Sequence, residues 1–306
     1  MPSRTVTSAL LVGLAAGIAG CGGGGGGGGD AIAPAPPPFP SFTLTQPYQT
    51  QTFAVSGISQ TGSGTTDSSG TITSSTPGPV DTANSTATIT YDPTQIPSVI
   101  SFATPQSSVT FDRSAGNSLI CTTPVCVGTT ATASGLAIDP IAAGWNYQTF
   151  GIWADSPTAT NWIAGAISVG YPTPASAVPT TGNATFTGVA AGFYVDSTGA
   201  LFGTAASMTA NADFTNRSIG FATSNTQVTD LSGTTIGPNL GLNLSGNLTY
   251  SAGTNQFSGP VSTTSPALSG TATGQFYGPT ANEIGGTYGL TGSGVSGMLG
   301  AFGGKR

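Results

Sequence analysis

Apolar and polar residues alternate along much of this 306-residue chain. Clusters of Gly, Pro, Asn, Asp and Ser interrupt the alternation about every 8 to 12 positions, a spacing typical of β-sandwiches and β-barrels. No long stretch shows the period of about 3.6 residues that an amphipathic helix requires. We therefore expect an all-β protein.

The alternation is most regular from residue 183 to the C-terminus. Within Leu240–Tyr250 the leucines and the tyrosine fall on one face, and polar residues such as Asn243 and Asn247 fall on the other. Phe202, Met208 and Phe214 likewise share one face of an expected strand. Eight strands joined by hairpins can close into an antiparallel up-and-down barrel, which removes exposed sheet edges and which side chains can fill. The expected strands are 183–195, 200–213, 217–225, 240–250, 255–261, 267–277, 284–291 and 297–303.

Residues 41–182 have a less regular pattern, and they predict a smaller, handle-like β-domain before the barrel at 183–306. Segments rich in Ser, Thr and Gly, such as 57–79, are interpreted as loops, and a Pro-rich stretch at 172–179 leads into the barrel. Strand positions favour core packing for Trp145, Trp153 and Trp162, with an exposed aromatic patch as the alternative. The strand candidates are Phe53–Ser59, Ala87–Tyr91, Val99–Phe102, Val109–Asp112 and a hairpin of Gln148–Ala154 with Trp162–Gly170.

The N-terminus has the features of an export signal. Arg4 is its only charge before Asp30, and the apolar or small run at 9–20 falls short of the roughly 20 residues of a membrane-spanning helix. Ile18–Cys21 resembles the bacterial lipobox, which implies a signal peptide at 1–20 and acylation of Cys21 by lipid chains such as palmitate. A plain signal peptide that ends near a cysteine is the alternative.

Residues 21–40 predict a tether between that cysteine and the folded body. Eight glycines follow Cys21, and a Pro-rich segment follows the glycines. A glycine run of this length behaves as a flexible coil with an r.m.s. span of roughly 15 Å, whereas prolines favour the extended polyproline II conformation. The lipid anchor would therefore attach the folded body to a membrane through this tether.

The composition excludes several classes of function. Charged residues make up 5% of the chain and histidine is absent, against a typical charged fraction of about 25%. Such a chain is a poor partner for nucleic acid, and it has neither a Ser-His-Asp triad nor His ligands for a metal or haem. The barrel aspartates Asp196, Asp213 and Asp230 fall at expected turns. We therefore expect a monomeric, non-enzymatic protein with no cofactor and no metal.

Cys121 and Cys126 are the other two cysteines of the chain. Two cysteines cannot supply the four ligands of a structural zinc site, and export to an oxidising compartment favours a disulfide. A bridge that closes so short a loop contributes about 2 kcal/mol. A pair of buried free thiols is the alternative.

The segment GQFYGPTANEIGGTY at 274–288 and the ending GAFGGKR at 300–306 resemble the transferrin-binding protein B family. The resemblance is strong over 183–306 and weak over 41–182. It implies a surface lipoprotein of the outer membrane, with an eight-stranded barrel beside a handle domain, that binds host iron proteins, haem carriers or other host proteins. The chain has room for one such lobe where transferrin binders have two, so transferrin as ligand does not carry over. The matching residues are Phe276, Tyr277, Gly278, Pro279, Ala281, Glu283, Gly285, Gly286, Phe302, Lys305 and Arg306.

Glu283 is the only glutamate of the chain. It could contact a ligand, but unpaired N–H donors of the adjacent turn favour a structural role for its carboxylate and for the motif as a whole. We expect a lipoprotein that captures a protein or an iron-bearing ligand, with a structural spacer as the alternative. The cell-surface side of the outer membrane is the expected location, with its periplasmic face as the alternative.

Overall fold

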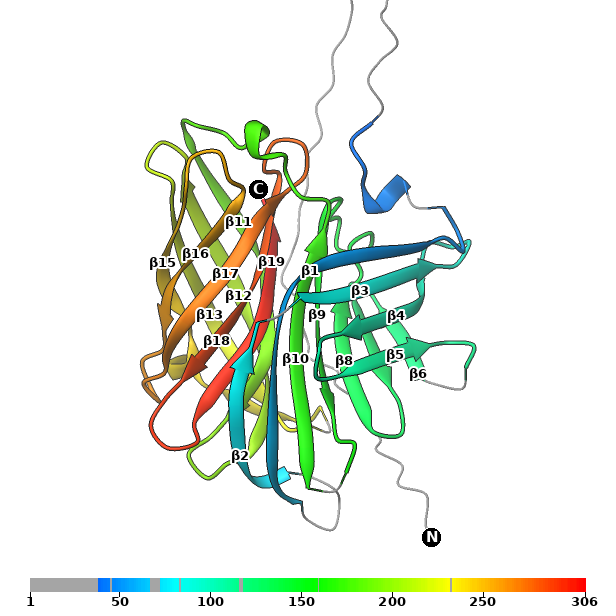
Figure 1. Cartoon of the computed structure of the whole chain (residues 1–306), viewed down its shortest axis with the longest axis vertical. Helices are drawn as coiled ribbons and strands as arrows, with labels where there is room; N and C mark the ends of the chain where they lie inside the picture. The colour runs from blue at the N-terminus through cyan, green and yellow to red at the C-terminus, as the bar shows by residue number, and fades with distance from the viewer. Residues whose placement is uncertain are drawn as a thin grey trace, which may run out of the picture.

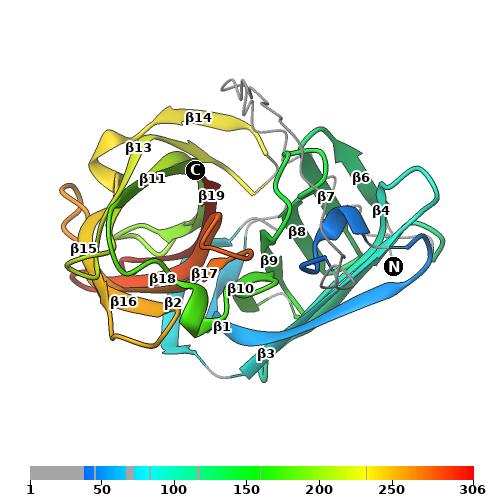
Figure 2. The same cartoon turned by 90° about the horizontal axis from the view of Figure 1, so that it is seen from above.

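The computed structural model describes residues 38–44, 46–66, 72–82, 84–115, 118–158, 160–231 and 233–306. The predicted signal peptide, Cys21 and nearly all of the predicted tether lie outside these ranges. The described chain is all-β, with two antiparallel sheets side by side (Figures 1 and 2). Its helical elements are three short 3-10 turns, η1 (Phe42–Leu44), η2 (Ala175–Ala177) and η3 (Leu240–Leu242). Within the described ranges, no helix has the length and apolar character needed to cross a bilayer.

The C-terminal sheet is a closed barrel of eight antiparallel strands, as the alternation predicts. Its strands pair with their neighbours in the sheet, and pairing of β12 with β13 closes the ring. A further short strand, β14 (Thr235–Pro238), pairs with β13 outside this ring. The barrel strands are β11 (Asn183–Val195), β12 (Leu201–Asp213), β13 (Ser218–Thr229), β15 (Ser245–Tyr250), β16 (Gln256–Ser262), β17 (Ser269–Tyr277), β18 (Glu283–Thr291) and β19 (Gly297–Lys305).

Alternate side chains of the barrel strands fill its interior. Met208, Ala210, Ala212 and Phe214 lie in this core, with Phe202 packed against it, which confirms the predicted face of β12. Successive side chains of a strand point to opposite faces of the sheet. One face of each barrel strand therefore builds the core, and the other faces outward.

The N-terminal sheet, which we call the handle, has the strand order β5-β4-β3-β1-β10-β9-β8-β7-β6, with β2 paired to β1. The long strand β1 pairs with β3 along its first half and with β10 along its second half. The sheet is strongly curved (Figure 2). Its own core contains Phe42, Phe111 and Trp153. Its strands are β1 (Thr50–Thr66), β2 (Ile72–Asp81), β3 (Asn84–Tyr91), β4 (Pro97–Ala103), β5 (Ser108–Asp112), β6 (Ser118–Thr122), β7 (Val125–Thr129), β8 (Ala133–Ile138), β9 (Gln148–Asp155) and β10 (Asn161–Gly170).

A third core joins the handle to the outer wall of the barrel. Ile58, Phe150 and Trp162 of the handle pack there with Phe193 and Leu299 of the barrel. Burial on both faces makes β9, β10, β18 and β19 buried along almost their whole length. The handle and the barrel therefore share an extensive apolar junction.

Two predictions about local structure are wrong. Residues 240–244 do not form a strand, because the Asn239 side chain caps η3 at Gly241 and the Asn243 side chain bonds to Thr226. Such local side-chain bonds compete with strand pairing, and Leu240 is left 57% exposed. Much of the segment interpreted as a loop at 57–79 belongs to β1 and β2, because backbone pairing with β10 and between the two strands extends it despite its polar sequence.

Candidate functional site

Most residues of the C-terminal motif meet where one end of the barrel joins the handle. Glu283 stands at the start of β18 and is 3% exposed. Its Oε1 accepts a hydrogen bond from the N–H of Asn146 at 2.6 Å, and its Oε2 accepts bonds from the N–H groups of Tyr147 at 2.9 Å and Gln148 at 2.8 Å. The donors belong to the handle segment that enters β9, and not to the turn beside Glu283. One barrel carboxylate therefore holds three consecutive N–H groups of the handle.

Burial dominates the titration of this carboxyl group. Loss of water raises the pKa of Glu283 above its ordinary value, while the three N–H donors and the nearby Lys305 act in the opposite direction. The Lys305 ammonium also donates to the carbonyl oxygen of Gly144 at 3.1 Å. The first and last residues of the β18–β19 pair thus both hold the segment 144–148.

Tyr277 and Gly278 form a second contact with the handle. The Tyr277 hydroxyl lies 3.1 Å from the Ser168 hydroxyl of β10, and the Gly278 N–H donates to the Tyr171 carbonyl at 2.9 Å. Gly278 has a φ of +86°, and a Cβ on it would lie 2.6 Å from the Tyr147 ring. Glycine is therefore required here both by the left-handed backbone and by close packing.

Glycines on the outer face of β18 and β19 allow the handle to approach the barrel wall. A Cβ on Gly285 would lie 2.5 Å from the Ser168 hydroxyl and 2.8 Å from the Gln148 side-chain oxygen, and a Cβ on Gly303 would collide with the same amide. Gly286 points to the other face, where a Cβ would lie 2.7 Å from the Phe302 ring inside the barrel. The adjacent glycines therefore serve two different cores.

Arg306 covers the end of the barrel beside the same turn. Its guanidinium lies 5.8 Å and 5.7 Å from the ring centroids of Phe186 and Phe214. It donates to the carbonyl oxygens of Ala281, at 2.8 Å, and Thr280, and partial burial lowers its pKa. The barrel core contains Phe276, Ala281 and Phe302. Pro279 lies in the turn that also contains Ala281.

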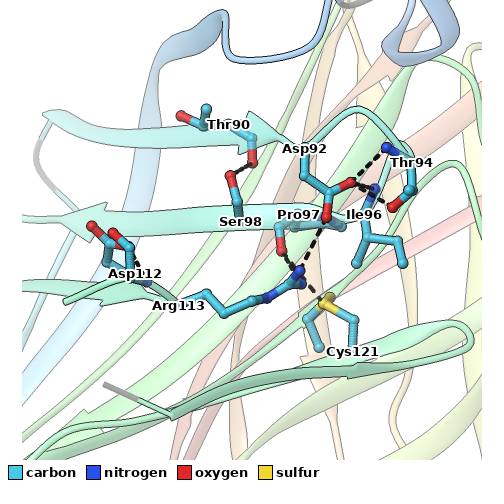
Figure 3. Close-up of polar contacts among 11 residues, drawn as sticks. Thr90, Asp92, Thr94, Ile96, Pro97, Ser98, Asp112, Arg113 and Cys121 are labelled. Atoms are coloured by element: carbon cyan, nitrogen blue, oxygen red, sulfur yellow. Dashed lines mark hydrogen bonds and ion pairs between the residues drawn. A yellow bond between two sulfur atoms is a disulfide. The ribbon is translucent and has the colours of Figure 1, made fainter. Parts of the chain in front are cut away.

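The Cys121–Cys126 pair forms a disulfide between directly opposed residues of β6 and β7. Beside it, Arg113 pairs with Asp92 at 3.1 Å and donates to the Pro97 carbonyl at 2.6 Å (Figure 3). Asp92 also accepts bonds from Thr94 and from the Ile96 N–H. The hydroxyl of Thr94 is the main cause that lowers the pKa of Asp92.

A cavity of about 210 Å³ lies between the turn at 94–96, the disulfide hairpin and the segment 139–142. Its acidic group, Asp139, is 5% exposed and accepts bonds from the N–H groups of Ile141 and Ala142. Burial raises the pKa of Asp139 against the effect of these two donors. The carboxylate is thus occupied with its own turn.

The other polar candidates also have local partners. Asp196, Asp213 and Asp230 each accept hydrogen bonds from N–H groups of the turns that follow them. Among the described residues, no three His, Cys, Asp or Glu side chains are grouped closely enough to hold a metal ion.

The three tryptophans are buried, which confirms core packing. Trp153 stacks on Phe102 in the handle core, with ring centroids 5.0 Å apart, while Trp145 and Trp162 lie in the junction. They therefore do not form one cluster.

The exposed apolar side chains were not identified from the sequence. One group, which lies in the handle, consists of Leu44, Tyr48, Ile96 and Ile120. A second group, Ile236 and Leu240, lies on the connection between β13 and β15, at the barrel end opposite the junction with Glu283. The large exposed apolar residues are Leu44, Tyr48, Ile96, Ile120, Ile236 and Leu240.

Comparison with solved structures finds distant similarities. Transferrin Binding Protein B from Haemophilus parasuis Hp5 is 14% identical, with 76% of this chain and 54% of that chain covered and a TM-score of 0.43. The haemoglobin receptor HpuA from Kingella denitrificans is 18% identical, with 90% and 92% covered and a TM-score of 0.41. The N-lobe domain of Lactoferrin Binding Protein B of Moraxella bovis is 10% identical, with 82% and 99% covered and a TM-score of 0.39. The chain thus spans about half the length of the first of these proteins.

No curated protein sequence matches the chain. A family model does match it, over residues 178–306, and it describes the C-lobe and N-lobe beta barrels of Tf-binding protein B. The matched residues contain the whole eight-stranded barrel and the motif that fastens it to the handle. The C-terminal barrel of this chain is therefore similar to the C-lobe and N-lobe beta barrels of Tf-binding protein B.

Proposed function

We propose that the protein is an outer-membrane lipoprotein that captures a protein or an iron-bearing ligand and catalyses no reaction. The family match of the barrel is the observation that carries this proposal. In it, residues 1–20 are a signal peptide, acylated Cys21 is the membrane anchor, and residues 21–40 are the tether. The handle and the barrel form the body that meets the ligand, on the cell-surface side of the membrane.

We place the ligand surface on the connection between β13 and β15. It is the longest connection between paired barrel strands, because β13 ends at Thr229 and β15 begins at Ser245. Hydrogen bonds from Thr226 to the Asn243 side chain hold its base, at 3.1 Å and 2.7 Å. Binding residues are often found on such loops when a rigid scaffold supports them. Ile236 and Leu240 are its exposed apolar anchors.

An iron-carrier protein is the ligand class that fits best. The chain contains no histidine, so direct contact with haem or iron would depend on tyrosine or carboxylate groups. Exposed apolar side chains on a loop instead suit the surface of a protein partner. Solved structures of similar proteins are described as binding transferrin, lactoferrin or haemoglobin.

Calorimetry with residues 38–306 and purified transferrin, lactoferrin, haemoglobin and free haem tests this proposal. We expect heat of binding with at least one of the carrier proteins. The double variant Ile236→Ser/Leu240→Ser should lose binding, whereas the matched variant Leu44→Ser should retain it. Absence of binding to all four, together with unchanged iron-limited growth of a deletion strain, would support a structural spacer instead.

The anchor has its own test. Cys21→Ser should abolish incorporation of labelled fatty acid and release the protein from the membrane fraction. Retention of that variant in the membrane would show that Cys21 is not the anchor. Protease treatment of intact cells then distinguishes the outer face of the membrane from the periplasmic face.

A further inference from the structure

Four of the six large apolar side chains exposed by the described residues lie at one end of the handle. They are Leu44, Tyr48, Ile96 and Ile120, with exposed fractions of 50%, 70%, 38% and 60%. We call them the handle patch. Tyr48 and Ile96 are held beside each other, because the Tyr48 N–H donates to the Tyr91 carbonyl and β3 ends there before the turn that contains Ile96.

The handle patch adjoins the place where the chain enters the body. The Phe39 ring packs against Tyr147 with centroids 5.6 Å apart, and Phe42 is fully buried in the handle core. The chain then passes Leu44 and reaches Tyr48 before β1 begins at Thr50. Any restraint on the N-terminal segment therefore acts at this end of the body.

The length of that segment limits how far the patch can be from Cys21. Residues 22–37 separate Cys21 from Pro38, the first described residue. Even fully extended, a chain of this length reaches at most roughly 60 Å. If Cys21 is acylated, as the proposed function requires, Pro38 stays within that distance of the lipid surface.

The chemistry of the patch suits the boundary between headgroups and acyl chains. Tyrosine combines an apolar ring with a polar hydroxyl and is enriched at membrane interfaces, while leucine and isoleucine can enter the apolar layer. The charges nearby have local partners: Asp92 and Arg113 pair with each other, Asp112 accepts bonds from Ser114, and the buried Asp139 accepts bonds from its own turn. Little charge would therefore have to leave water.

We propose that the handle patch rests on the lipid surface that holds Cys21. This contact is an addition to the covalent anchor and orients the body on the membrane. Because Ile236 and Leu240 lie on the barrel and not on the handle, the same contact leaves the proposed ligand surface free. A protein partner is the less favoured occupant, because the segment that precedes Pro38 keeps this end of the body within reach of the lipid surface.

Tryptophan quenching in full-length lipidated protein tests the contact. The protein is reconstituted into phosphatidylcholine vesicles whose acyl chains are brominated, and Tyr48→Trp places an indole in the patch. The native tryptophans are at most 2% exposed, so they contribute little quenching. Ile236→Trp is the matched control on the barrel.

We expect a blue shift and a loss of emission for Tyr48→Trp and no change for Ile236→Trp. Adding Leu44→Ser, Ile96→Ser and Ile120→Ser should reduce the quenching while the protein still floats with the vesicles. Equal quenching at the two positions, or none at position 48, would overturn the proposal, and shielding of position 48 by a carrier protein instead would identify a protein surface. A full-length chain that does not float with the vesicles would overturn the anchor as well.

Discussion

The barrel and the handle bury their strands in different ways. Pairing of β12 with β13 closes the barrel, so a strand such as β15 alternates between buried and exposed residues. The handle sheet stays open between its edge strands β5 and β6, and its strand β9 is buried along nearly all of its length. One face of β9 belongs to the handle core and the other to the junction. The sequence of a strand therefore alternates between apolar and polar residues only where one face of the strand is exposed to solvent.

Two barrel strands follow the handle's pattern. β18 and β19 are buried on both faces because their outer face is the wall on which the handle lies. That wall carries Gly285 and Gly303 where Ser168 and Gln148 approach. The comparison shows that the junction is built as a protein interior, with close packing and a buried carboxylate.

The largest expected effect comes from breaking the one-faced pattern of the barrel. Leu248 is fully buried in the barrel core, so Leu248→Asp would bury an unpaired carboxylate and should cost more than about 4 kcal/mol of folding free energy. Its neighbour Asn247 is exposed, and Asn247→Asp should change stability little. Chemical denaturation followed by circular dichroism measures the stability of both variants. Equal losses of stability would contradict the assignment of Leu248 to the inner face and Asn247 to the outer face.

A smaller loss is expected where the two regions meet. Gly303→Val would force a side chain into the Gln148 amide, and such overpacking should cost about 3 kcal/mol. Gly220 lies on the outer face of β13, where the nearest atom to a Cβ is 4.0 Å away. Gly220→Val should therefore be tolerated, and denaturation midpoints that fall equally for both variants would show that the wall does not need its glycine.

Glu283→Gln tests the polar part of the junction. The amide would offer one acceptor oxygen and an NH₂ group to three N–H donors, so at least one buried N–H group would lose its partner, which should cost about 1 to 3 kcal/mol. Asp213→Asn is a matched control, because the Asp213 carboxylate accepts its bonds in an exposed turn. Calorimetric unfolding of the two variants measures the difference, and a larger loss for Asp213→Asn would contradict the role of Glu283.

The same carboxyl group predicts a pH dependence with a definite sign. Its pKa is raised in the folded protein, so the folded state binds more protons than the unfolded state between the ordinary and the raised pKa. The stabilisation from this group is therefore complete below the ordinary pKa and is lost as pH rises through the raised pKa. The stability difference between wild type and Glu283→Gln should shrink as pH rises from acid to neutral; growth of that difference would contradict the raised pKa.

The smallest effect should come from the disulfide. The double variant Cys121→Ser/Cys126→Ser reopens a loop whose ends are five positions apart, which should cost at most about 2 kcal/mol. The loss should appear in amides of β6 and β7 by hydrogen exchange, while those of the barrel stay protected. Equal deprotection of β13 and β15 would show that the hairpin stabilises the whole body.

The sequence predicts the barrel well, because a closed sheet with one solvent-exposed face gives a regular alternation of apolar and polar residues. The number of its strands and the inward face of β12 follow from the alternation and the turn residues, although the strand predicted at 240–250 begins only at Ser245. β6, β7 and β8 could not be predicted, because they are short and leave room for the Phe111 ring through Gly128 and Gly135. The contact of Glu283 with the handle could not be predicted either, because its three N–H donors lie more than 130 positions away in the sequence. No residue near Glu283 in the sequence indicates that these donors come close to it.

Equilibrium unfolding of the whole body tests most directly whether the junction makes one unit of the two regions. Tryptophan emission reports the handle and the junction, because the three tryptophans lie there, and pulsed hydrogen exchange of β12 and β13 reports the barrel. We expect the two signals to change at the same denaturant concentration in the wild type and to separate in Glu283→Gln/Gly303→Val. Separate midpoints in the wild type would contradict the single-unit structure.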